Sequence, residues 1–254
     1  MSKLTRNVGY SLCFLMMFSL FLIPNASFAK AENSFYADGF KTKEDLIHYF
    51  QDNHVSNNEQ KLLINKVENN QLWDVNNPEK LKEVPEDFYI FDPKNGSEKR
   101  YYRFEDGSFI KIETTQKNSK EINSSEESLA LRGVESGTGY SHYYDYKVKL
   151  TKGGMYASMV TEFVLVNGGN DYLIPSGFFE PRATGFGELG QMPSIQIVRE
   201  NEDSSLSRWA LANSNWYVNY PISTPWGGSS LSGTKYLWIG VGNNSFKVSD
   251  STPY

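Results

Sequence analysis

The residues best suited to ligand chemistry in this sequence are aromatic, and they gather near its C-terminus. Tryptophan and tyrosine recur at Trp209, Trp216, Tyr217, Tyr220, Trp226, Tyr236 and Trp238. Such rings are flat apolar surfaces with polar edges, and they suit sugars and partner proteins. We predict ligand contacts by Trp226, Trp216, Tyr217 and Tyr220. Trp226 is the first candidate, because Pro225 fixes one backbone angle and Gly227 and Gly228 permit a turn that holds the indole outward.

A β-sandwich core explains the same rings without a ligand. Tyr236 and Trp238 are two residues apart, so a strand places both side chains on one face. This spacing favours burial of the pair. The aromatic residues therefore have two interpretations, an exposed binding surface and a core.

Histidine and cysteine are too scarce to predict a metal centre. The chain has three histidines and one cysteine, and His48, His54 and His142 lack the paired spacing of a zinc site. We predict no metal and no cofactor. A Ser–His–Asp set that uses His142 stays open, because such sets are defined by geometry and not by sequence order.

Carboxylates offer the remaining route to catalysis. Glu162 lies inside an apolar run, Met159–Val164, and other acidic side chains follow in or near loops, at Glu180, Glu188, Glu200 and Glu202. A glycosidase needs two carboxylates about 5–10 Å apart, one of them with a raised pKa. Glu162 shares strand parity with Ser158 and Val160, and this mixed face favours an outward position.

Two glycine-rich segments match catalytic motifs only in part. Gly185–Gly190 has the spacing G-x-G-x-x-G, but Pro181 precedes it and Pro193 follows it, so we expect a loop and no dinucleotide site. The segment Gly227–Gly233 holds serines, but none of them has the G-x-S-x-G context of a hydrolase nucleophile. We therefore expect a non-catalytic protein.

The first 31 residues have the features of a secretory signal peptide. Lys3 and Arg6 precede the apolar run Leu12–Ile23. Ala29 and Ala31 form an A-x-A cleavage site after Ala31, and Ser27 and Ala29 offer a second site after Ala29. The run is shorter than the roughly 20 residues that a membrane-spanning helix needs, so we expect cleavage and no stable membrane insertion. Cleavage also removes Cys13, the only cysteine, so the mature fold needs no disulfide. Export without cysteine favours a Gram-positive source and a secreted or cell-wall-associated protein.

Length and charge exclude two further classes. The chain has 254 residues, 25 basic and 30 acidic side chains and a formal charge of −5. Removal of residues 1–31 takes away three basic residues and no acidic one, which leaves 22 basic residues, 30 acidic residues and a charge of −8. Nucleic-acid binding is not expected without clustered Lys and Arg. An aromatic content of 15% is too high for a disordered chain.

Local signals predict three regions after the signal peptide. Residues 32–114 form an α+β unit, with two short helices that begin at Thr42 and Ser56 and a hairpin around the turn 105–108. Residues 115–133 are polar and predict a linker. Residues 134–254 contain about six strand patterns, including 140–150 with Tyr144, Tyr146, Val148 and Leu150 on one face. They predict an antiparallel β-sandwich or barrel, so the chain is mainly β.

One segment carries a resemblance to other proteins. The runs Lys61–Lys66, Leu72–Asp74 and Tyr102–Phe109, with Pro78 between them, resemble a segment of uncharacterised secreted proteins of Gram-positive bacteria. The resemblance covers residues 60–110 and implies secretion and an accessory N-terminal unit. It implies no activity.

Three functions follow as alternatives. The leading prediction is a secreted, non-catalytic β-rich protein that binds a cell-envelope glycan or a protein partner. The second is a bacteriocin-like or membrane-acting secreted effector. The third is a secreted hydrolase that depends on carboxylates.

Overall fold

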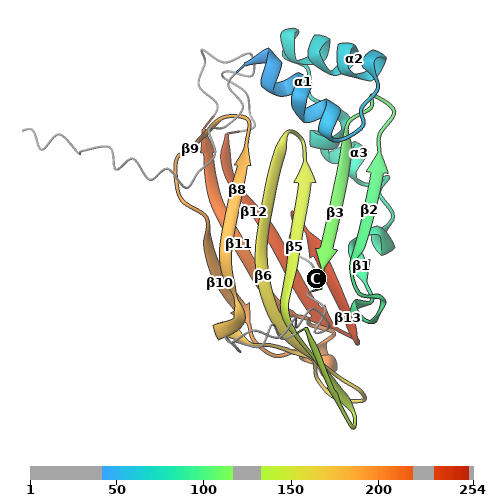
Figure 1. The fold of residues 1–254 in the computed structure, drawn as a ribbon, viewed down its shortest axis with the longest axis vertical. Coiled ribbons are helices and arrows are strands. Elements are labelled where there is room, and N and C mark those ends of the chain that lie inside the picture. Colours follow the sequence, from blue (N-terminus) through green and yellow to red (C-terminus); the bar gives the residue numbers. More distant parts are fainter. Residues whose placement is uncertain (1–41, 117–132, 220–231, 252–254) are drawn as a thin grey trace, which may run out of the picture. The chain divides into compact units, whose positions relative to one another are not determined.

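The computed structural model describes residues 42–116, 133–219 and 232–251. All of them belong to one compact unit, Tyr36–Tyr254 (Figure 1). The expected signal peptide, residues 1–31, lies outside the described residues. No described helix is both long enough and apolar enough to cross a membrane.

The two helices expected near the N-terminus are confirmed as α1 (Lys43–Asp52) and α2 (Asn57–Glu68). Both begin with a capping box, Thr42 with Asp45 and Ser56 with Glu59, which satisfies backbone N–H groups that the first turn leaves unpaired. A short helix α3 (Pro78–Leu81) follows. The 3-10 turns are η1 (Asp74–Asn76), η2 (Glu86–Tyr89), η3 (Pro93–Asn95), η4 (Pro175–Gly177) and η5 (Ser204–Leu206).

A seven-stranded antiparallel sheet forms one layer. Its order is β2-β3-β5-β6-β7, with β4 paired to β5 and β8 paired to β6. The strands are β2 (Glu98–Arg103), β3 (Phe109–Thr115), β4 (Val134–Gly137), β5 (Tyr140–Lys152), β6 (Met155–Val166), β7 (Tyr172–Leu173) and β8 (Phe179–Gly185). The expected hairpin is confirmed as β2–β3.

A six-stranded antiparallel sheet forms the other layer (Figure 1). Its order is β1-β13-β12-β11-β10, with β9 paired to β11. The strands are β1 (Ile90–Phe91), β9 (Glu188–Leu189), β10 (Ser194–Arg199), β11 (Ala210–Asn219), β12 (Gly233–Gly242) and β13 (Ser245–Ser249).

The main core fills the space between the two sheets. Tyr146 and Phe163 of the first sheet contact Phe246 of the second, with ring centroids 5.1 and 4.8 Å apart. All three side chains are fully buried. The predicted β-rich sandwich is therefore confirmed, and the strands form two facing sheets.

The expected separation of an N-terminal unit from a C-terminal β domain is wrong. Strand β3 pairs with β5 along the register Ile110↔Lys152 to Thr115↔Lys147. Strand β1 pairs with β13, at Phe91↔Phe246. The N-terminal strands thus complete both sheets, and β3 includes Thr115, the first residue of the expected linker. Residues 117–132 lie outside the described residues.

A β-bulge corrects the predicted face of β5. The register between β5 and β6 shifts between Tyr143 and Tyr146, and Asp145 takes a left-handed φ of 48°. The extra residue reverses the alternation, so Tyr143 is buried beside Phe163. The Tyr144 ring instead packs at a tilt against that of His142, outside the core. Tyr146, Val148 and Leu150 are buried as predicted.

Candidate functional site

The structure separates two neighbouring residues that we expected to act together. On β11, Trp216 is 2% exposed and faces the inter-sheet space, whereas Tyr217 is 41% exposed on the opposite side. Consecutive strand residues point to opposite faces, so both cannot belong to one surface. Trp216 and Tyr217 therefore do not share one surface, and the ligand contact predicted for Trp216 stays a prediction. The other two predicted residues, Tyr220 and Trp226, lie outside the described residues.

The pair expected in the core, Tyr236 and Trp238, lies on the outer side of β12. Tyr236 is 37% exposed, and its ring stacks on that of Trp238 with centroids 5.7 Å apart and an interplanar angle of 26°. The inner positions of this strand belong to Leu237, Ile239 and Val241, which are fully buried. The spacing correctly predicted that the two rings share a face, but the face is the outer one.

Strand register brings these rings into one surface, which we call the aromatic face: Tyr217, Tyr236 and Trp238 with Asn215 and Ser194. Tyr217 pairs with Thr234 and Asn215 pairs with Tyr236, so the two tyrosines are diagonal neighbours across β11 and β12. Trp238 is two residues beyond Tyr236 on the same side. The result is a strip of three rings that crosses two strands.

Hydrogen bonds hold an amide beside the rings. The Ser194 hydroxyl donates to Asn215 Oδ1 over 3.2 Å, and Asn215 Nδ2 donates to Asn213 Oδ1 over 3.0 Å. Gly190 packs closely on the Tyr217 ring, because a Cβ at this position would lie 2.9 Å from the ring carbon Cδ1. The aromatic face therefore combines flat apolar rings with an ordered amide.

A cavity of about 300 Å³ lies at one end of the inter-sheet space, and Tyr236 of the aromatic face is one of the residues that line it. Its walls come from both sheets and from the helical segment before β1. Apolar side chains make up much of the lining, at Leu81, Leu150, Met155, Ala157 and Trp216. The polar residues that line it include Asn76, Lys152, Lys235 and Asp250.

Two lysines reach this cavity from facing strands. Lys152 is the last residue of β5 and shares parity with buried Val148 and Leu150. Lys235 is opposite buried Trp216 in the register of β11 and β12 and shares parity with buried Leu237. Each lysine thus occupies an inward position where its strand reaches the end of the core.

The two lysines differ in their partners. Lys152 Nζ forms an ion pair with Asp250. Lys235 has no ion pair or hydrogen bond to any residue in the described ranges. Burial, with the positive charge of Lys152 adding to it, holds the pKa of Lys235 below its usual range, although Asp250 acts in the opposite direction. A lysine of lowered pKa in a concave site marks a binding-site candidate.

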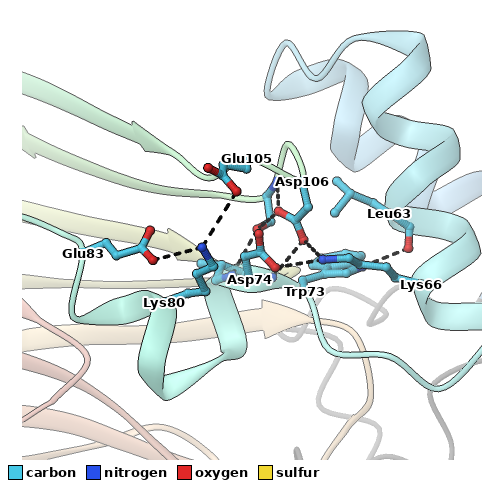
Figure 2. A network of polar contacts seen from close by, with 10 residues as sticks. Leu63, Lys66, Trp73, Asp74, Lys80, Glu83, Glu105 and Asp106 are labelled. Atoms are coloured by element: carbon cyan, nitrogen blue, oxygen red, sulfur yellow. Dashed lines mark hydrogen bonds and ion pairs between the residues drawn. The ribbon is translucent and has the colours of Figure 1, made fainter.

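A polar network fixes the helical wall of the cavity (Figure 2). The Lys66 ammonium contacts Asp74 Oδ1 at 2.8 Å and Asp106 Oδ2 at 2.7 Å. Asp106 Oδ2 also accepts the Asp74 backbone N–H, and the Ser108 hydroxyl accepts the Val75 N–H. These contacts tie η1 to the β2–β3 turn. They therefore place Asn76, the last residue of η1, against the cavity.

Glu162, the candidate catalytic acid, forms a pair with His142. Its Oε1 lies 2.8 Å from His142 Nε2, and both side chains are mostly buried. Glu162 lies on the side of β6 opposite to buried Phe163, as its parity predicted. Gly177 of η4 packs so closely on Glu162 that a Cβ there would lie 2.1 Å from the side chain. Room for a sugar ring is therefore lacking on that side.

Two other carboxylates do meet, but they are structural. Asp171 and Glu202 are 0% and 5% exposed. Asp171 accepts backbone N–H groups from Val166 and Asn244, and Glu202 accepts those of Asp171 and Asn243. Burial, more than the nearby Glu202, raises the pKa of Asp171. The two carboxylates thus join the segments around residues 166–171, 202 and 243–244. Because both are buried, a substrate cannot reach them.

The remaining motifs supply no catalytic geometry. Gly185 ends β8 and Phe186 is buried against Tyr49 and Trp73, so this part of the G-x-G-x-x-G segment is packed into the core and is followed by β9, not by a helix. Of the serine-bearing segment Gly227–Gly233, only the last two residues are described. Within the described ranges, no three His, Cys, Asp or Glu side chains are grouped to hold a metal ion.

No protein-family model, curated protein or solved structure matches the chain.

Sequence reasoning missed the cavity lysines, although a signal for them exists. In both strands a lysine continues the every-second-residue pattern of buried side chains: Val148, Leu150 and Lys152 in one, Lys235, Leu237 and Ile239 in the other. A charge on the buried parity of a strand is unusual, because an unpaired buried charge is costly. A charged residue in this pattern therefore indicates either the end of a strand or a binding site.

Proposed function

We propose that this protein is a secreted, non-catalytic binding protein that recognises a cell-envelope glycan through its aromatic face. The observation that supports the proposal is the strip of Tyr217, Tyr236 and Trp238 beside the ordered amide of Asn215. Two of these rings are more than a third exposed, although a protein usually buries its large aromatic side chains.

The chemistry of the aromatic face suits a sugar chain. The C–H groups of a pyranose ring pack on aromatic faces, and its hydroxyl groups need donors and acceptors nearby, which the Asn215 amide and the tyrosine hydroxyls supply. Because the rings cross two neighbouring strands, they fit an extended chain better than a single deep-bound sugar. Catalysis is not part of the proposal, because Asp171 and Glu202 are buried and accept hydrogen bonds from backbone N–H groups.

The proposal is tested with Tyr217→Ala and binding to purified Gram-positive peptidoglycan. Tyr217 is exposed and does not line the cavity, so its loss isolates the aromatic face. We expect binding in a sedimentation assay to weaken at least tenfold, because aromatic anchors dominate small contact patches. The melting temperature should stay unchanged.

Tyr140→Ala is the matched control. Tyr140 is also 41% exposed, but it belongs to β5 in the other sheet. It should bind peptidoglycan as the unmodified protein does. Equal binding by both variants and the unmodified protein would overturn the proposal, as would absence of peptidoglycan binding.

A further inference from the structure

We propose that the cavity between the sheets is a second binding site, for a small amphiphilic anion with an apolar body and one negatively charged group. This inference does not depend on the glycan proposal. It concerns the cavity that Lys152, Lys235, Asp250 and Trp216 line.

Among the described residues that line the cavity, positive charges outnumber negative ones. Lys152 and Lys235 bring two positive charges, and Asp250, which pairs with Lys152, brings one negative charge. Glu162, Asp171 and Glu202 do not line this cavity. One ammonium group, that of Lys235, is therefore left for a ligand. A carboxylate, phosphate or sulfonate group supplies the missing charge.

The apolar side chains of the lining favour a ligand with an apolar body. Trp216 and Ala157 are 2% and 4% exposed, and Leu150 is 4% exposed, so the inner wall is continuous with the sandwich core. A bare hydrated anion would leave this wall without contacts. An apolar body that displaces water from it contributes about 25 cal/mol for each Å² covered.

The cavity lies beside the first residues of strand β12. Strand β12 pairs with β11 from Gly233 onward, whereas its pairing with β13 begins at Trp238, opposite Ser249. Thr234, Lys235 and Tyr236 therefore extend beyond the partner strand β13, and all three line the cavity. The site thus lies beside the N-terminal end of β12, past the last residue of β13.

The test uses two fluorescent probes of similar shape and different charge. The sulfonate 8-anilino-1-naphthalenesulfonate carries one negative charge, and N-phenyl-1-naphthylamine carries none. We expect the full chain to bind one sulfonate probe, and Lys235→Gln to weaken its affinity about tenfold, the effect of losing one charged hydrogen bond. Affinity for the neutral probe should not change.

Lys147→Gln is the matched control, because Lys147 is an exposed lysine of β5 that does not line the cavity. It should bind both probes as the unmodified protein does. Salt provides a test without any substitution. Higher ionic strength should lower the affinity for the sulfonate probe and leave the affinity for the neutral probe unchanged. Octanoate should displace the sulfonate probe, and inorganic phosphate at the same concentration should not.

Three results would overturn the inference. The first is equal affinity of the sulfonate probe for the unmodified protein and Lys235→Gln. The second is an equal loss of affinity for both probes in Lys235→Gln, which would mean that the substitution changed only the shape of the cavity. The third is displacement by inorganic phosphate, which would make the cavity a bare anion site without a role for its apolar wall.

Discussion

At the scale of single residues, the effect of a buried charged group on stability depends on the hydrogen-bond partners that surround it. Asp106 is 8% exposed, yet it is stable as a carboxylate because Lys66, Ser108 and two backbone N–H groups all donate to it. Lys235 is also partly buried, but no hydrogen-bond acceptor among the described residues binds its ammonium group. The first group is structural and the second is available for binding.

Asp106 links protein stability to pH. Burial alone would raise its pKa, but the hydrogen bonds from Lys66 and Ser108 and the backbone hydrogen bonds outweigh it and hold the pKa below the ordinary value of 3.8. The folded state therefore favours the carboxylate, and this contribution to stability is present above pH about 4 and lost as the pH falls through the lowered pKa.

We predict that Asp106→Asn lowers the free energy of unfolding by roughly 2 kcal/mol near neutral pH. The difference from the unmodified protein should shrink below pH about 4, where the unmodified carboxylate also gains a proton. Urea unfolding across this pH range measures it. Glu105→Gln is the control, because the Glu105 side chain is 88% exposed, and it should change little. A pH-independent loss in Asp106→Asn would contradict the prediction.

At the scale of elements, α2 is joined to the sheet through its own cap. The Ser56 side chain accepts the Glu59 N–H, and Glu59 Oε2 accepts the Ser56 N–H at 2.8 Å. Arg103 of β2 donates to the same carboxylate oxygen at 3.0 Å. Glu59, which completes the capping box, therefore also fixes the helix against β2.

We predict that Ser56→Ala destabilises the protein by about 1 kcal/mol and that Glu59→Ala costs more, because it removes both the cap and the contact with Arg103. Ser56→Gly should cost only a few tenths of a kcal/mol, since glycine is accepted at the N-cap. Thermal unfolding ranks the three variants. Equal losses in Ser56→Ala and Glu59→Ala would show that Arg103 contributes nothing through Glu59.

At the scale of the whole molecule, the two sheets need both halves of the chain. The hairpin β2–β3 extends the sheet of β5 and β6, and β1 is the edge strand beside β13. Tyr49 of α1 adds to this joining, because its hydroxyl accepts the Gly154 N–H of the β5–β6 turn. A cut between the halves therefore leaves every one of these contacts in place.

We predict that a chain cleaved between residues 117 and 132 stays together. A specific protease site inserted there and cut should leave two fragments that co-elute in native size-exclusion chromatography. They should separate in denaturant, because backbone ladders and shared core contacts, not the peptide link, hold them together. An uncut insertion variant controls for the insertion itself. Separation of the fragments in native buffer would restore the picture of two independent domains.

The sequence alone determined the local elements. The capping boxes at Thr42 and Ser56, the hairpin around residues 105–108 and the β-rich character of the described residues 134–219 and 232–251 are all present in the structure. These features depend on residues within a few positions of one another, so their signals are complete in short windows of sequence.

Only the tertiary structure decided which surfaces those elements present. Period-two alternation shows that Tyr236 and Trp238 share a face, but it does not show whether that face meets the other sheet or the solvent. A single bulge residue reversed the alternation at Tyr144, and pairing of β3 with β5 joined the expected domains. The Lys152 and Lys235 site has the same origin: its residues are 83 positions apart and meet only because the two sheets end together around one cavity.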